Sequence, residues 1–336
     1  MDSLSQLALG AAVGVAVMGR RTAVWKAALW GAVAGTLPDL DVLIDHGDPI
    51  RNMVWHRADT HALFWLTLFS LPFAAAVARL QGEWALWRRW WLAMWLALVT
   101  HPLLDAMTVY GTRLALPFSD TPYGVGSMFI IDPLYTLPLL VGVAWALVAG
   151  RYDRGLAANA LGLAISTAYL AWSFAAQQYV EGLARAALAE RGLSTQILLV
   201  TPTPFNTLLW RVLAMEVDDY HEGFHSLLDA DRRIVFDRFD RGAELGAELR
   251  DLDSVQLIAA FSKGFFKLEQ VGARVLISDL RMGQEPTYTF TFAVAEGRSA
   301  LTALQPPEQV GMRPDIARVW GWLWRRAAGQ PLPPPR

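Results

Sequence analysis

The 336-residue sequence contains no cysteine. Disulfide bonds and thiolate chemistry are therefore excluded, and any bound metal must rely on histidine, aspartate and glutamate. An excess of positive charge is also missing, because 29 Lys and Arg stand against 31 Asp and Glu, for a net charge of −2. This balance gives no sign of a nucleic-acid-binding surface.

Charged residues are few, at 18% of the chain, where a soluble domain carries about 25%. Hydrophobic residues make up 54% and crowd into the first half, whereas the second half reads as an ordinary globular sequence. We therefore expect residues 1–176 to form a mainly α integral membrane domain with the functional site. Residues 177–336 are expected to form a small α+β extracytoplasmic domain.

Apolar runs in the first half predict about six transmembrane helices. The first two runs are short, which favours a tightly packed helical hairpin. The six runs cover residues 4–18, 23–37, 62–80, 90–107, 129–148 and 156–175. Beyond residue 177 the pattern indicates a mostly antiparallel sheet, and residues 313–328 predict an amphipathic interfacial helix.

Basic residues occupy alternate loops, and such loops are typically cytoplasmic. They are Arg20, Arg21, Lys26, Arg79, Arg88, Arg89, Arg151 and Arg154. The other loops and the C-terminal domain should then lie outside a bacterial inner membrane, which the chain crosses several times. The lipid bilayer is the expected partner.

Three histidines and three aspartates fall on this outer side, close to the apolar runs. They are Asp39, Asp41, His56, His61, His101 and Asp105. A carboxylate at the edge of a hydrocarbon layer is costly unless it is paired or bound to metal. The six residues therefore predict a divalent metal site. Their side chains suit Zn²⁺, or Mn²⁺ if carboxylates dominate.

Taken as three pairs, these six residues also have explanations other than metal binding. His101 and Asp105 lie four residues apart on one side of a helix, which suits two metal ligands or a polar hook at the helix end. The Asp39–Asp41 pair follows a proline, where aspartates bind metal or form a turn. His56 and His61 are five residues apart, which places His56 in a connection and His61 at the start of the third run.

Other residues on the same side have two interpretations each. Arg57 and Arg113 match phosphate oxygens or anchor helices at the headgroup level. Asp132 opens the fifth run, where it contributes to the site or caps the helix. The sequence HEGFH at 221–225 matches the helical H-E-x-x-H zinc motif. Because its neighbours alternate as in a strand, which separates the histidines by roughly 13 Å, we interpret it as part of a sheet.

Four segments together resemble the YdjM-like family of membrane-bound, predicted metal-dependent hydrolases. They are GTLPDLD, HRADTHALF, HPLLDAMTVYGTRLALPF and IIDPLYTLPLL. The resemblance covers roughly the first 150 residues and implies that the six residues named above are the metal set. The family in turn looks distantly similar to zinc-dependent phospholipase C. Ala58 and Ala62 depart from the family pattern, which has glycine and serine there.

These observations favour a metal-dependent hydrolase at the outer face of the cytoplasmic membrane. A phospholipid or a lipid-linked phosphoester would be its substrate. Asp39 and Asp105 are the candidate catalytic carboxylates, and Arg57 would steady a phosphate. The alternatives are a non-catalytic membrane protein with a structural metal and a partner-binding outer domain, and a membrane zinc protease using HEGFH.

Overall fold

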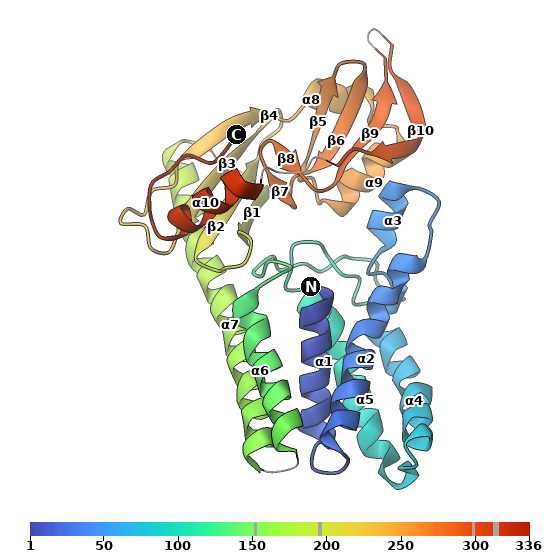
Figure 1. Cartoon of the computed structure of the whole chain (residues 1–336). Coiled ribbons are helices and arrows are strands. Elements are labelled where there is room, and N and C mark those ends of the chain that lie inside the picture. The colour runs from blue at the N-terminus through green and yellow to red at the C-terminus, as the bar shows by residue number, and fades with distance from the viewer. Residues whose placement is uncertain (151–152, 194–196, 298–299, 312–315) are drawn as a thin grey trace. The chain divides into compact units, whose positions relative to one another are not determined.

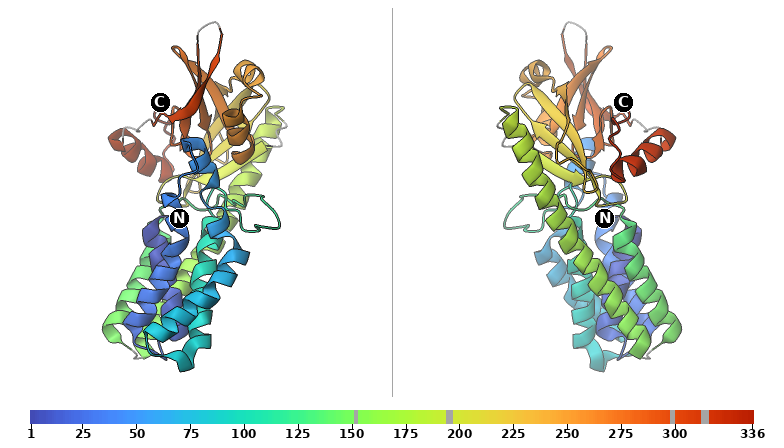
Figure 2. Two further views of the ribbon diagram at one scale, coloured as in Figure 1. Left: turned by 90° about the vertical axis from the view of Figure 1, so that its right-hand side faces the viewer. Right: turned by 90° about the vertical axis from the view of Figure 1, so that its left-hand side faces the viewer.

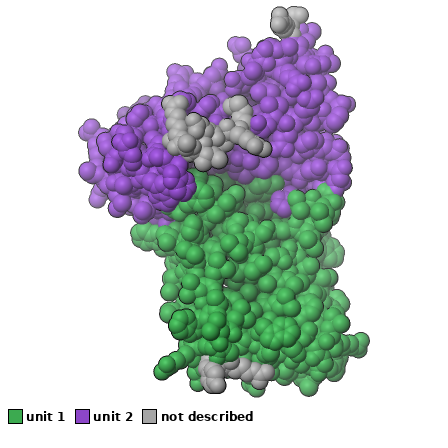
Figure 3. All heavy atoms as spheres, viewed as in Figure 1, with its two compact units in different colours: residues 1–44, 57–175, 204–206 green, residues 45–56, 176–203, 207–336 purple. Residues whose placement is uncertain are grey.

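The computed structural model describes residues 1–150, 153–193, 197–297, 300–311 and 316–336. The chain forms two compact units, coloured separately in Figure 3. Unit 1 contains residues 1–44, 57–175 and 204–206, and unit 2 contains residues 45–56, 176–203 and 207–336. Arg151 and Arg313, used in the sequence predictions, lie outside the described residues.

Unit 1 is helical, and helix α1 lies at its centre in contact with α2, α5 and α6 (Figure 1). Its elements are α1 Ser3–Met18, α2 Val24–Thr36, the 3-10 helix η1 Leu37–Leu43, η2 Asp59–His61, α4 Leu63–Leu80, η3 Trp84–Leu86, α5 Trp87–Asp105 and α6 Pro133–Ala149. Helix α7 Asp153–Glu190 begins in unit 1 and continues into unit 2 as one uninterrupted helix (Figure 2).

Helices α1 and α2 pack with their backbones in direct contact. A Cβ atom built on Gly31 would lie 2.2 Å from the carbonyl oxygen of Gly10, and one on Gly14 would lie 2.3 Å from that of Ala27. Only glycine allows such an approach. The short hairpin expected from the sequence is therefore closely packed through its small residues.

The expectation of about six transmembrane helices is wrong. Among the described residues, two helices are long and apolar enough to cross a membrane, α4 and α7. Helix α2 has 13 residues, a length of about 20 Å at 1.5 Å per residue, short of the roughly 30 Å hydrocarbon core. Helices α1 and α6 have 16 and 17 residues. Helix α5 is longer but carries Arg88, Arg89, His101 and Asp105, which lower its mean hydropathy.

Unit 2 is rich in antiparallel sheet. One sheet has the order β1-β2-β3-β4, a second has the order β10-β9-β6-β5, and β7 and β8 pair by themselves. The strands are β1 Ile197–Pro202, β2 Leu209–Met215, β3 Asp219–Ser226, β4 Phe236–Asp240, β5 Phe266–Val271, β6 Arg274–Asp279, β7 Gly283–Gln284, β8 Thr287–Tyr288, β9 Thr291–Glu296 and β10 Thr302–Gln309.

Helices α3 Pro49–Trp55, α8 Ala243–Glu248, α9 Asp253–Phe261 and α10 Ile316–Ala327 accompany these strands, together with the C-terminal part of α7. Helix α10 packs within unit 2, because the Trp322 ring lies 5.1 Å from that of Phe224 and Arg326 pairs with Asp229. Trp320 and Trp324 of the same helix remain exposed. The role of this helix at a membrane interface stays a prediction.

The HEGFH segment lies on strand β3, as its alternation predicted. Its glutamate, Glu222, is completely buried and accepts hydrogen bonds at 2.7 Å from Arg211 Nε and at 2.6 Å from Arg336 Nη1. Arg211 is itself buried and also donates to the carbonyl oxygen of Leu280. Glu222 therefore neutralises a buried guanidinium in the core of unit 2.

We expect Glu222→Gln to destabilise the protein by about 3–5 kcal/mol, because Arg211 would keep a buried charge without its carboxylate partner. Asp237→Asn is the matched control, since Asp237 pairs with Arg336 on the surface and should cost less than about 1 kcal/mol. Denaturant unfolding of the purified protein measures both. Loss of bound metal in a folded Glu222→Gln variant would contradict the structural role.

Candidate metal centre

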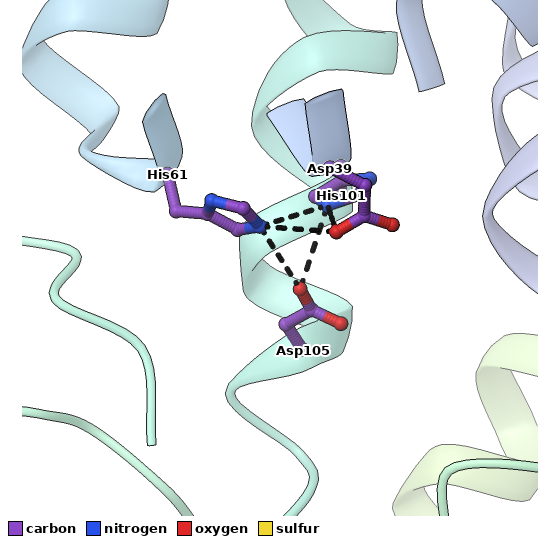
Figure 4. A group of neighbouring side chains, drawn as sticks. All are labelled: Asp39, His61, His101 and Asp105. Atoms are coloured by element: carbon purple, nitrogen blue, oxygen red, sulfur yellow. Dashed lines mark hydrogen bonds and ion pairs between the residues drawn. The ribbon is translucent and has the colours of Figure 1, made fainter. Parts of the chain in front are cut away.

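Four of the predicted ligands meet in unit 1, carried by three separate segments (Figure 4). Asp39 lies in η1, directly after Pro38 of the same 3-10 helix, and His61 ends η2. His101 and Asp105 lie one turn apart at the C-terminal end of α5. One ligand atom from each residue lies within 4.8 Å of the other three.

The distances between these atoms match a tetrahedral metal centre. His61 Nε2 and His101 Nε2 are 3.1 Å apart, and each lies 3.4 Å from Asp39 Oδ1. Asp105 Oδ2 lies 3.3 Å from His61 Nε2 and 3.4 Å from His101 Nε2. Ligands bound tetrahedrally at about 2.0 Å are separated by roughly 3.3 Å. The two nitrogens and two oxygens could therefore hold one divalent ion.

Hydrogen bonds on the far side of each imidazole fix which nitrogen faces the centre. His101 Nδ1 lies 2.7 Å from the carbonyl oxygen of Gly35, so Nδ1 carries the hydrogen. His61 Nδ1 lies 3.0 Å from Thr60 Oγ1, whose own hydrogen is donated to Asp41 Oδ2. With its hydrogen on Nδ1, each ring can present the lone pair of Nε2 to a metal ion at the centre, as in metal-ligating histidines.

A buried carboxylate oxygen of Asp105 also indicates that the centre could hold a metal ion. Asp105 is fully buried, and its Oδ2 accepts no hydrogen bond from any described residue. Two imidazole lone pairs and two carboxylate oxygens facing one another require a cation between them. The residues present therefore fit a metal ion.

Without a metal, protons supply part of the missing positive charge. Burial opposes a charge on His101, but the carboxylates of Asp105 and Asp39 outweigh it and raise the pKa of His101 to about 9. Burial likewise opposes ionisation of Asp39, yet hydrogen bonds from His101 and His61 hold its pKa below the ordinary range. Asp39 and Asp105 consequently remain carboxylates near neutral pH.

The other predicted residues lie outside the four-residue cluster. Asp41 supports the centre from behind, because its Oδ2 accepts hydrogen bonds from the Arg57 amide and from Thr60. His56 ends helix α3 in unit 2. Asp132 caps helix α6 by accepting from the Leu134 amide, and also accepts from the Tyr169 hydroxyl at 2.9 Å.

Arg57 lies at the edge of the centre. Its side chain is buried, with Nε 3.3 Å from Asp105 Oδ2 and Nη1 3.3 Å from Thr108 Oγ1. Its φ is +64°, an unusual value for a non-glycine residue. The amide of Arg57 donates to Asp41, which helps to hold this backbone conformation.

The sequence reasoning missed Gln6, Gly35 and Thr60, which contact the ligands from outside the cluster. Gln6 could have been noticed as a polar residue inside the first apolar run. The Gly35 contribution is a backbone carbonyl, for which a sequence carries no signal.

A helical unit with two candidate membrane-crossing helices and a His/Asp cluster defines a membrane protein with a candidate metal centre. A family model described as YdjM inner membrane protein matches residues 1–180. The chain therefore belongs to the YdjM inner membrane protein family, which indicates an inner-membrane location. No curated protein and no solved structure matches the chain. The distant similarity to zinc-dependent phospholipase C stays a prediction.

We expect Gly35→Ala to weaken metal binding. Its new Cβ would lie 2.6 Å from the backbone oxygen of Gln6, so α2 must shift and carry with it the carbonyl that orients His101. The overpacking should also destabilise the fold by about 1–3 kcal/mol. Gly182→Ala on α7 is the control, since nothing lies within 4 Å of its Cβ position. Unchanged metal affinity in Gly35→Ala, measured by calorimetry, would contradict the orienting role.

Metal binding should depend on pH, because the metal displaces a proton from His101. With its pKa at about 9, the apparent affinity should rise about tenfold per pH unit through neutrality and level off above pH 9. In the metal-free protein the sign reverses, since this raised pKa stabilises the fold below about pH 6.5 and the effect is lost as pH rises through 9. Calorimetry in buffers of different ionisation enthalpy measures the released proton, and a pH-independent affinity would contradict it.

Proposed function

We propose that the protein is a metal-dependent hydrolase that cleaves a phosphoester in a phospholipid or lipid-linked substrate. The observation that carries the proposal is the tetrahedral cluster of two histidines and two aspartates, with a buried arginine beside it. A divalent ion held there, Zn²⁺ or Mn²⁺ by its N₂O₂ ligands, would supply a Lewis acid that activates water.

Arg57 is suited to hold the phosphate. Its guanidinium is buried, and Nε donates no hydrogen bond to a described residue. The stacking of the guanidinium over Tyr110, 4.9 Å from the ring centroid, fixes its plane. Because a guanidinium matches phosphate oxygens in planar geometry, it would neutralise charge on the reacting phosphoryl group.

Asp39 is suited to take a proton from water. It is the one member of the cluster whose side chain reaches the surface, with 22% exposure against complete burial of the other three. Substrate and water would therefore approach from the Asp39 side. Its lowered pKa keeps it ionised, and Asp105 in the buried position would act mainly as a ligand.

A lipid substrate suits the surroundings of Asp39. In η1 the residues between and after the aspartates are apolar and exposed, with Leu40 at 55%, Val42 at 73% and Leu43 at 80%. Exposed apolar groups of this density mark contact with a membrane or another apolar partner. The acyl or prenyl part of a lipid would lie against them while its headgroup reaches the metal centre.

The outer face of the membrane is the proposed side. The turns after α1 and α4 lie at the end of unit 1 opposite η1 (Figure 1). Basic residues gather at those turns, including Arg20, Arg21, Arg88 and Arg89. Under the positive-inside tendency that end would be cytoplasmic and the metal centre extracytoplasmic.

A second candidate is a non-catalytic protein with a structural metal. The four protein ligands favour it, because structural zinc sites are closed by four side chains and catalytic sites usually keep one position for water. The two candidates differ in whether Asp39 stays bound to the ion when substrate arrives.

We expect the wild-type protein in detergent to bind one divalent ion and the double variant His101→Ala plus Asp105→Ala to lose it. His221→Ala, on the sheet of unit 2, should retain it. Elemental analysis gives metal content, and release of phosphate or alcohol from phospholipid and prenyl-phosphate vesicles gives activity. Arg57→Lys should bind metal but lose about 10²-fold or more in turnover, as when one donor to a developing anion is removed.

The outcomes separate the candidates. Metal bound by wild type with hydrolysis that disappears in the double variant supports the hydrolase. Metal bound with no hydrolysis of any lipid phosphoester, and lower thermal stability after chelation, supports the structural role. Equal metal in wild type and double variant contradicts both.

A further inference from the structure

Helix α1 brings a glutamine into contact with two of the metal-centre residues. Gln6 is completely buried, and its Nε2 donates to Asp105 Oδ1 at 3.0 Å and to the carbonyl oxygen of His101 at 3.2 Å. Because both neighbours are acceptors, the amide can take only this orientation. Its Oε1 accepts no hydrogen bond from a described residue.

We propose that Gln6 is a positioning residue that makes Asp105 a ligand through one oxygen only. Gln6 engages Oδ1, which the amino group of Met1 also contacts. Oδ2 is left to face His61 and His101. The amide adds a second donor to Oδ1 and so restricts rotation of the carboxylate about its terminal torsion, which is a broad and weakly restrained one. This inference rests on the metal centre of the proposed function and not on its hydrolytic activity.

The same glutamine ties the two ligands of α5 to each other. Its amide bridges the backbone of His101 and the side chain of Asp105, one helical turn apart. This turn contains Pro102, which has no amide hydrogen to reinforce the helix. Gln6 therefore bridges the turn of α5 in which Pro102 removes a backbone donor.

The glycine contact between α1 and α2 sets the depth of Gln6. A Cβ on Gly35 would meet the Gln6 carbonyl oxygen at 2.6 Å and the Gly10 Cα at 2.9 Å, so the two backbones touch at this level. Gly35 is also the residue whose carbonyl orients His101. One helix pair thus supplies the outer hydrogen bonds of both ligands on α5.

Burial alone does not explain a glutamine here. After Gln6, helix α1 carries only apolar residues from Leu7 to its end at Met18, and leucine fills a similar volume without a polar group that needs partners. The matched case in unit 1 is Asn159 on α7, which is also buried and donates to the carbonyl oxygen of Ala12 at 2.9 Å, while its Oδ1 accepts no hydrogen bond within the described part of the chain. Asn159 therefore shares with Gln6 its burial, a hydrogen bond donated to a backbone carbonyl and an unpartnered side-chain oxygen, but it donates away from the four-residue cluster.

The test compares Gln6→Leu with Asn159→Leu in the full-length protein, using Co²⁺ as the probe. Gln6→Leu should bind Co²⁺ about 10- to 100-fold more weakly than wild type, the range found when outer hydrogen bonds to metal ligands are lost. Its visible d–d spectrum should also change, because the mode of Asp105 coordination changes. Asn159→Leu should keep the wild-type spectrum and an affinity within about twofold, although both variants lose a buried amide and both should unfold more easily.

Wild-type affinity and spectrum in Gln6→Leu would overturn the proposal. An equal loss of affinity in both variants would also overturn it, because the effect would then be one of general packing. Failure of the proposed function would give a different result. Wild type would bind Co²⁺ but hydrolyse no lipid phosphoester, and Gln6→Leu would still bind Co²⁺ more weakly than Asn159→Leu.

Discussion

The fully buried carboxylate of Asp105 is the constraint on which the rest of unit 1 depends. Removing a carboxylate from water costs several kcal/mol unless opposite charge and hydrogen bonds replace the hydration. Helix α1 contributes the Gln6 amide, and Arg57 brings a guanidinium to 3.3 Å from the second oxygen. A cation held between this oxygen, His61 and His101 would supply the rest. The close packing of α1 against α2 places the Gln6 amide beside Asp105 and the Gly35 carbonyl oxygen beside His101.

A ligand is easier to predict from the sequence when residues close to it in the chain determine where its side chain points. His101 and Asp105 are recognisable because a helix places residues four apart on one side. Asp39 and Asp41 are harder, since a turn after Pro38 can point either carboxylate inward. The structure places Asp39 in the cluster and Asp41 behind His61, where it accepts from Thr60. That division of roles depends on the 3-10 geometry of η1 and cannot be read from spacing alone.

The number of transmembrane helices was overestimated because the sequence does not show directly where each helix ends. A run of apolar residues records composition, whereas a membrane span also needs unbroken length. The second apolar run yields a helix of only 13 residues because Pro38 and the aspartates after it begin a 3-10 helix. The sixth apolar run forms a helix that is longer than predicted. Its helix continues to Glu190, because Ala176, Val180 and Ala184 at intervals of four form an apolar stripe in the core of unit 2.

A segment of unit 2 lies, in the sequence, between the first and second ligand segments of the metal centre. Residues 45–56 lie between Asp41 and Arg57, and they belong to unit 2, where α3 packs on α9 and β10. Ile50, Met53 and Val54 of α3 are buried, and Arg51 pairs with Asp253 at 2.9 Å. The first ligand segment and the second are thus connected through a helix held by the sheet-rich unit. The backbone of Arg57 adopts a left-handed conformation directly after this segment, and its amide donates to Asp41 Oδ2. The family match ends at residue 180, so α9 and β10, the elements that contact α3, lie outside the matched residues.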